Sequence, residues 1–213
     1  GIPAIAEVIM LERDLRLVEL TGARYHAAHV TTAAAVEAIR NAKARGLQVT
    51  CDTAPHYFSL TDAATAEYRT FAQLSPPLRC EKDRLAVIEG LRDGTIDIIA
   101  SDHRPQDQDS KRLPFVQAEP GSVGIETLLP LTLALHREAD ISQLDLICRL
   151  TSAPGELLRM KEGRLAPGLP AGMVIFDPDH DWTVEAADLK SRSKNTTFDQ
   201  VQMRGKAMCT IVG

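Results

Sequence analysis

The residues with the clearest chemical potential follow an apolar segment of the chain. The run from Ile96 to Ala100 has the pattern of a buried strand, and Ser101-Asp102-His103 come directly after it. Apolar strands without alternation suit a parallel sheet that is covered on both faces. In β/α barrels the carboxyl ends of such strands carry the chemistry, so Asp102 is a candidate catalytic residue. A helix cap or a turn is the structural alternative for Asp102, and its position alone does not decide between them.

A histidine ends an earlier apolar stretch, which runs from Tyr25 to Val30 and contains His29. Neutral imidazole and carboxylate are ligands that zinc accepts where a water molecule must be activated for hydrolysis. His29 and Asp102 are therefore candidate metal ligands. Two ligands do not make a site, because catalytic zinc takes at least three from the protein. A hydrogen-bonded core histidine remains the alternative for His29.

Three further histidines lie near these strand ends. His26 precedes His29 by three residues, so on a strand it would face the opposite side and pack outward or against a helix. His56 follows the next strand and is either a ligand or a loop residue. His103 has no role that spacing assigns, although a contact with Asp102 or its surroundings fits its place.

The composition bounds the class of protein. The 213 residues carry a net charge of −5, with 44% hydrophobic and 25% charged residues, as in an ordinary globular enzyme. No basic stripe points to nucleic acid, no apolar run is long enough to span a bilayer, and the N-terminus lacks a signal-peptide pattern. The cysteines lie far apart and are expected to be reduced, at Cys51, Cys80, Cys148 and Cys209. We therefore expect a cytoplasmic enzyme with a small-molecule substrate.

The elements that must position these residues alternate between strand and helix. The spacing of apolar and capping residues predicts helices over 7–22, 33–44 and 81–92, and strands over 25–30, 47–53 and 96–100. This order is the signature of right-handed β/α units on a parallel sheet. Three strands are visible where a closed barrel needs eight. We therefore expect the chain to begin in the middle of a larger protein.

The chain changes character after about residue 164. Glycines and prolines punctuate 163–172, a strand is predicted over 173–178, and 201–212 has the pattern of a hairpin that turns at Gly205. These strands are too few for a sheet of their own and need partners from elsewhere. Two loops could place a substrate. The loop Ser75-Pro76-Pro77 is stiff, and the segment from Gly121 to Thr127 could bring backbone N–H groups close to a ligand, although it lacks a phosphate-loop pattern.

Taken together, these segments resemble the amidohydrolase superfamily and, within it, the cyclic-amide hydrolases, most closely the bacterial dihydroorotases. Each motif is weak alone, but the ordered set extends along the whole chain. The matching stretches are Tyr25–Thr32, Val49–His56, Pro76–Arg79, Ser101–Pro105, Gly121–Thr127 with Leu129-Pro130, Ala171–Asp177 and Thr210–Gly213.

The resemblance implies an α/β fold in which 1–163 form the C-terminal part of a (β/α)8 TIM-type barrel and 164–213 the C-terminal strands of a small β-sandwich. It implies that His29 binds zinc at the end of the sixth barrel strand. Asp102, at the end of the eighth, would contact one or two Zn²⁺ ions and shuttle the proton. The remaining ligands would lie upstream of Gly1, so the chain alone is not expected to bind zinc tightly or to turn over.

Two positions depart from the dihydroorotase pattern. Ser75 stands where Asn is usual and Gln106 where a second His is usual, and the resemblance implies that both, with Gly121, bind substrate. These departures leave two alternatives open: a non-catalytic scaffold for aspartate transcarbamoylase, and a sister hydrolase of allantoin or hydantoin. A homodimer is expected, with aspartate transcarbamoylase as a candidate partner.

Overall fold

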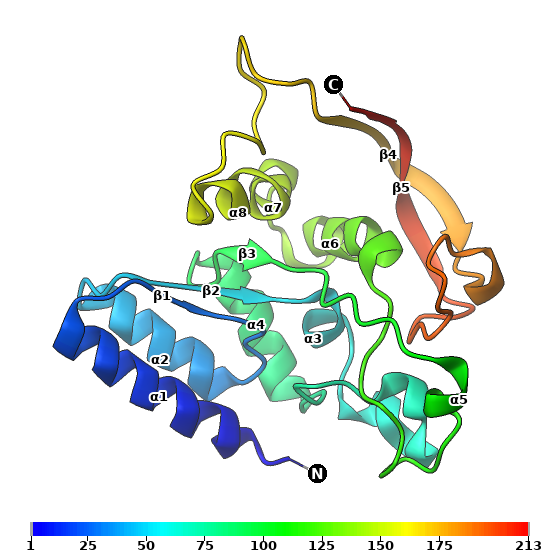
Figure 1. The fold of residues 1–213 in the computed structure, drawn as a ribbon, viewed down its shortest axis with the longest axis horizontal. Coiled ribbons are helices and arrows are strands. Elements are labelled where there is room, and N and C mark those ends of the chain that lie inside the picture. The colour runs from blue at the N-terminus through cyan, green and yellow to red at the C-terminus, as the bar shows by residue number, and fades with distance from the viewer. Residues whose placement is uncertain (1, 213) are drawn as a thin grey trace.

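A computed structural model describes residues 2–212 and shows a mixed α/β fold (Figure 1). Its first part alternates helices and strands. The helices are α1 (Ala4–Thr21), α2 (Ala33–Ala44) and α4 (Glu81–Arg92), and the strands are β1 (Tyr25–Ala27), β2 (Val49–Thr53) and β3 (Ile98–Ile99). These elements confirm the predicted β/α units, although each strand is shorter than its apolar pattern suggested.

The three strands form one parallel sheet in the order β1-β2-β3. Tyr25 of β1 lies opposite Val49 of β2, and Asp52 of β2 lies opposite Ile98 of β3. Helices α1, α2 and α4 run along one face of the sheet (Figure 1). The main core fills the space between helices and sheet, and its fully buried members include Ile39, Cys51, Val87, Leu91 and Ile96.

Local signals explain where these helices begin and end. Helix α1 buries Val8, Leu11, Leu15 and Val18, which recur every three or four residues on one face. It ends at Gly22, whose φ of 67° is the left-handed conformation that glycine adopts without strain. Helix α2 begins at Thr32, whose hydroxyl accepts the Ala35 N–H.

Two irregular stretches complete the part of the chain around the sheet. Between β2 and α4 lie α3 (Pro55–Ser59) and two 3₁₀ helices, η1 (Asp62–Tyr68) and η2 (Thr70–Ala72). After β3 come α5 (Gln108–Lys111), α6 (Ile125–Ala139), α7 (Gln143–Leu150) and α8 (Ser152–Leu157). Helix α6 packs against α3, so both connections meet near the carboxyl ends of the strands.

The C-terminal part forms a separate two-stranded antiparallel sheet. Strand β4 (Met173–Thr183) pairs with β5 (Gln202–Ile211), and η3 (Ala186–Asp188) lies between them. The predicted hairpin turn at Gly205 is wrong, because Gly205 lies inside β5. A Cβ at Gly205 would come within 2.8 Å of Leu133 Cδ1 on α6, so glycine permits close packing there rather than a turn. No helix within 2–212 has the length and apolar character of a membrane span.

Candidate active site

The loop after β1 carries His29. The strand ends at Ala27, and His29 has a φ of 56°, a left-handed conformation that is uncommon outside glycine. Hydrogen bonds to β2 hold this turn: the His29 N–H donates to Asp52 Oδ1 at 2.8 Å, and the Val30 N–H donates to the Asp52 carbonyl at 2.8 Å. The backbone path, rather than strand alternation, therefore sets the direction of the His29 side chain.

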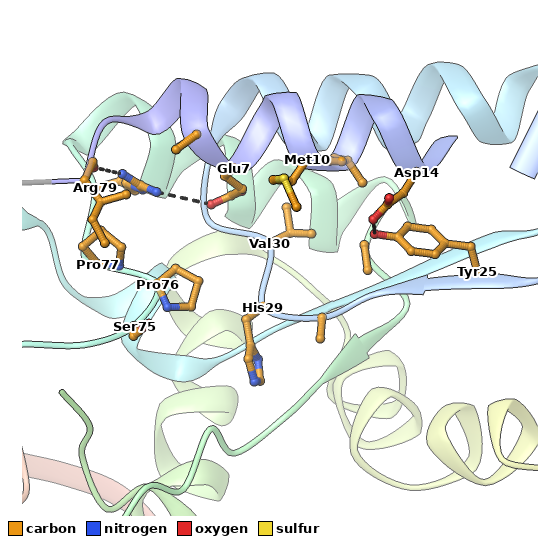
Figure 2. Close-up of a pocket in the computed structure, with 15 residues that line it drawn as sticks. Glu7, Met10, Asp14, Tyr25, His29, Val30, Ser75, Pro76, Pro77 and Arg79 are labelled. Carbon is orange, nitrogen blue, oxygen red and sulfur yellow. Dashed lines mark hydrogen bonds and ion pairs between the residues drawn. The ribbon is translucent and has the colours of Figure 1, made fainter. Parts of the chain in front are cut away.

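Helix α1 holds the same loop from the other side. The Glu7 carboxylate accepts the N–H groups of Thr31 and Thr32 at 2.9 and 3.1 Å and both threonine hydroxyls. Arg79 lies 3.5 Å from Glu7 and donates to the Thr31 hydroxyl. Figure 2 shows Glu7 and Arg79 together near α1, while the His29 ring points away from that helix.

Asp102 lies in the loop that follows β3 and is 8% exposed. It also has a left-handed φ, of 42°, so both candidate ligands follow strands in strained backbone. The Tyr57 hydroxyl donates to Asp102 Oδ2 at 2.9 Å, and Arg104 Nε lies 3.0 Å from Oδ1. His29 Nε2 lies 3.6 Å from the same Oδ1. Strand ends that are far apart in the sequence therefore bring an imidazole and a carboxylate together.

This pair fits two of the ligands of a zinc ion. Ligands of a tetrahedral zinc with bonds of about 2.1 Å lie about 3.4 Å apart, close to the 3.6 Å between His29 Nε2 and Asp102 Oδ1. Asp102 Oδ1 is also buried and, although Arg104 Nε lies 3.0 Å away, it accepts no well-formed hydrogen bond, which is compatible with a role as a metal ligand. Within 2–212 no group of three or more His, Cys, Asp or Glu side chains could hold a metal. The described residues could thus supply two ligands of an ion but not a complete metal site.

A buried carboxylate lies behind His29. Asp52 Oδ2 accepts a hydrogen bond from His26 Nε2 at 2.9 Å, and Oδ1 lies 3.0 Å from His29 Nδ1. Burial opposes ionisation of this carboxyl, but hydrogen bonds from His26 and His29 outweigh burial and lower the pKa of Asp52 to about 2. Contact with Asp52 raises the pKa of His29 above its usual value, against the effect of burial. A metal at His29 would therefore compete with a proton.

His26 does not pack outward or against a helix as the spacing suggested. It lies on the same face of the sheet as Thr50 and Asp52, and its Nδ1 is 2.8 Å from the Thr50 hydroxyl. Alternation along a strand failed as a guide because β1 ends before His29. His26 and His29 consequently approach one carboxylate from two directions.

The other two histidines have different surroundings. His56, in α3, is fully buried, its ring nitrogens have no hydrogen-bond partner, and its ring lies 5.4 Å from that of Phe198. Burial lowers the pKa of His56 to about 4. His56 is thus a buried helix residue rather than an exposed loop residue. His103 Nδ1 accepts the Gly124 N–H at 3.1 Å and caps the start of α6.

The three residues expected to bind substrate lie in two places. Ser75 and His29 line the same cavity, which has a volume of about 360 Å³ (Figure 2). Gln106 and Gly121 lie close together, because a Cβ on Gly121 would be 3.2 Å from Gln106 Nε2. The Gln106 side chain donates to the Pro120 carbonyl at 2.9 Å.

Gly121 contributes the absence of a side chain rather than a hydrogen-bond donor. Its N–H donates to the Gln73 carbonyl at 2.9 Å, so that group is not free for a ligand. A Cβ on Gly121 would lie 2.8 Å from Arg104 Cβ, and its φ is 139°. Glycine therefore lets this loop approach Arg104, the residue that contacts Asp102.

Sequence reasoning missed three residues that organise this site: Asp52, Tyr57 and Asn195. Asp52 gave a signal, because it interrupts a β-forming run with a carboxylate. No signal in the sequence marked Tyr57 or Asn195, because the residues that they contact are distant in the chain. Asn195 Nδ2 donates to the carbonyls of Arg104 and Gly121 at 3.0 and 3.1 Å.

Comparison with known proteins places this geometry in a family. The model of the Amidohydrolase family matches residues 4–208. The chain is 46% identical over 213 residues to a protein named Dihydroorotase from Anaplasma phagocytophilum, and 49% identical over 212 residues to one of that name from Syntrophotalea carbinolica. Each alignment covers 100% of this chain, but 48% and 50% of the relative. The chain thus spans about half the length of these relatives.

Solved structures of similar fold bear related names. The dihydropyrimidinase from Brevibacillus agri superposes with a TM-score of 0.91 at 25% identity, covering 98% of this chain and 48% of that one. The L-hydantoinase from Arthrobacter aurescens gives a TM-score of 0.85 at 29% identity, covering 95% and 46%. Similarity in sequence and in structure therefore extends over nearly the whole chain.

Proposed function

Because the chain belongs to the amidohydrolase family, we propose that the full-length protein hydrolyses a cyclic amide and that its substrate is dihydroorotate. The relatives named Dihydroorotase, at 46% and 49% identity along the whole chain, support this choice of substrate. The reaction converts dihydroorotate and water to N-carbamoyl-L-aspartate and, in reverse, closes the ring for de novo pyrimidine biosynthesis. The observation that carries the proposal is the 3.6 Å separation of His29 Nε2 and Asp102 Oδ1.

The architecture that we propose for this enzyme follows its family. Residues 1–163 would form the C-terminal part of a (β/α)8 barrel, which the three parallel strands and their helices support. Residues 164–213 would belong to a small β-sandwich, which the β4–β5 pair supports. The site would hold one or two Zn²⁺ ions, with His29 and Asp102 among the ligands, and bound zinc supplies polarisation of the amide carbonyl and activation of water.

Asp102 would act as the base and then as the acid. Its carboxylate takes a proton from the attacking water and delivers it to the ring nitrogen that departs. Tyr57 holds Oδ2, so Oδ1 is the oxygen that faces His29 and the reacting groups. Arg104 Nε lies 3.0 Å from Oδ1 and pairs with this carboxylate.

Ser75 and Gln106, with Gly121, are the substrate contacts that we propose in this chain. Ser75 shares the cavity of His29 and can donate or accept a hydrogen bond. Gln106 would act through its side-chain carbonyl oxygen or its second amide hydrogen, since one amide hydrogen already donates to the Pro120 carbonyl. Gly121 would shape the wall on the Arg104 side.

The test uses the full-length protein with dihydroorotate and with N-carbamoyl-L-aspartate. Turnover and stoichiometric zinc are expected for the wild type, and replacement of Asp102 with Ala should remove turnover. The exposed Asp179→Ala serves as a control that keeps it. Activity indifferent to Asp102→Ala would reject the assigned role.

Two alternatives have specific support. The departures at Ser75 and Gln106 favour a scaffold for aspartate transcarbamoylase, which stoichiometric zinc with turnover would eliminate. The names of the solved neighbours favour a hydantoin or dihydropyrimidine substrate, which a substrate panel would reveal. In the dihydroorotase proposal the protein is a cytoplasmic homodimer.

A further inference from the structure

Asp52 is a buried carboxylate without a role in the reaction described above. It lies on β2 and is 6% exposed. Its two carboxylate oxygens contact residues of the neighbouring strand β1 and of the loop that follows β1. Oδ1 accepts the His29 backbone N–H at 2.8 Å and lies 3.0 Å from His29 Nδ1. Oδ2 accepts His26 Nε2 at 2.9 Å. Burial of a charged carboxylate costs free energy unless it is well hydrogen-bonded, so this arrangement calls for a reason.

His26 fixes the position of that carboxylate. While its Nε2 donates to Asp52, its Nδ1 lies 2.8 Å from the Thr50 hydroxyl, which can donate to it. Thr50 and His26 lie directly opposite each other on β2 and β1. The two strands therefore hold His26 at both ring nitrogens, and His26 in turn holds Asp52 Oδ2.

The two ring nitrogens of His29 lie near two different carboxylates. Its Nδ1 lies 3.0 Å from Asp52 Oδ1, within hydrogen-bond distance but not aligned for a well-formed bond, while its Nε2 lies 3.6 Å from Asp102 Oδ1. A histidine that binds a metal through one nitrogen is commonly oriented by an acceptor at the other, which also fixes its tautomer and strengthens it as a ligand. Asp52 occupies that place relative to His29.

We propose that Asp52, braced by His26 and Thr50, is a positioning residue that directs His29 Nε2 toward the metal beside Asp102. The inference rests on the proposed function, because it takes His29 as a metal ligand. Asp52 also holds the His29 N–H, and so it stabilises the left-handed backbone that presents the ring. One side chain thus sets both the main-chain and the side-chain geometry of the ligand.

The experiment measures zinc affinity of the full-length protein by competition with a chromophoric chelator. Asp52→Asn keeps an oxygen for the His29 N–H but loses the charge and the acceptor for His26. The expected result is a zinc affinity lower by about 10- to 100-fold. Asp97→Asn is the matched control, since Asp97 accepts the Cys51 N–H at 2.8 Å and pairs with Lys43 at 2.7 Å, on the same sheet. It should lower the thermal midpoint and leave zinc affinity unchanged.

A second pair of variants keeps the proposal testable if Asp52→Asn does not fold. His26→Gln can still donate to Asp52 and accept from Thr50, whereas His26→Ala can do neither. Zinc affinity should fall in His26→Ala and recover in His26→Gln. If the folded Asp52 variant, or His26→Ala, binds zinc as tightly as the wild type, the inference is overturned. A wild-type protein that binds no zinc would instead overturn the proposed function.

Discussion

The phenol of Tyr57 donates a hydrogen bond to Asp102 Oδ2 at 2.9 Å within the protein interior. Burial and the neighbouring Asp102 charge raise the pKa of Tyr57, so the phenol remains a donor across the physiological range. Helix α3 thereby holds one oxygen of the Asp102 carboxylate, which lies in the loop after β3. The other oxygen is left to face His29.

Replacement of Tyr57 with Phe should lower kcat by about 10- to 100-fold with a smaller change in KM, because a hydrogen bond to a charged group contributes about 1.5–3 kcal/mol. Steady-state kinetics of the full-length protein measure this effect. Tyr25→Phe is the matched control, since the Tyr25 hydroxyl donates to Asp14 at 3.1 Å instead. An unchanged kcat in Tyr57→Phe would show that Tyr57 does not orient Asp102.

Stability should depend on pH through His56. Burial lowers its pKa from 6.5 to about 4 in the folded protein, so between these values the unfolded chain binds the proton and the folded protein does not. The free energy of unfolding is therefore not reduced by His56 above pH 6.5, and it falls as the pH is lowered from 6.5 toward 4. His56→Phe should reduce the difference in unfolding free energy between about pH 7.5 and about pH 5 by about 2 kcal/mol.

Urea denaturation of wild type and variant at both pH values measures that difference. His180→Phe, on β4, controls for the loss of a histidine in general. An equal pH dependence in wild type and His56→Phe would contradict the account of a buried neutral imidazole.

The start of α6 leaves no space for a side chain at Gly124. A Cβ there would overlap the Ser101 carbonyl oxygen and lie 3.3 Å from His56 Cε1. Gly124→Ala should therefore destabilise the protein by about 1–3 kcal/mol and lower activity, because the backbone next to Asp102 must move. Thermal denaturation and kcat measure both effects. Gly172→Ala has open space around its Cβ and should leave both unchanged, and equal behaviour of the two variants would refute the steric argument.

Asn195 connects the C-terminal part of the chain to the loops after β3. Besides donating to Arg104 and Gly121, it accepts the Gln106 N–H at 3.1 Å. Asn195→Ala leaves these buried groups without partners and should cost about 2–4 kcal/mol of unfolding free energy in chemical denaturation. Asn41→Ala, which removes an exposed bond to Glu37, should cost less than about 0.5 kcal/mol. Similar costs for both would argue against the role of Asn195.

Local patterns determined most of the secondary structure. The apolar spacing of α1 and the cap at Thr32 depend on neighbours within a few residues, so the sequence predicted both helices. The error at Gly205 arose because this glycine is required inside β5, where its φ is 111° and a Cβ would meet Leu133 on a distant helix. A glycine at a turn and a glycine under a packed helix look the same in sequence, and only contact with the other element separates them.

For the site, the sequence by itself determined which side chains end the strands, and the resemblance singled out His29 and Asp102. Only the tertiary structure decided their companions. Asp52 and Tyr57 reach them through the register of β1 and β2 and the placement of α3, neither of which is encoded in local spacing. Residue types set what chemistry is available, whereas the packing of distant segments sets which atoms come within a hydrogen bond of each other.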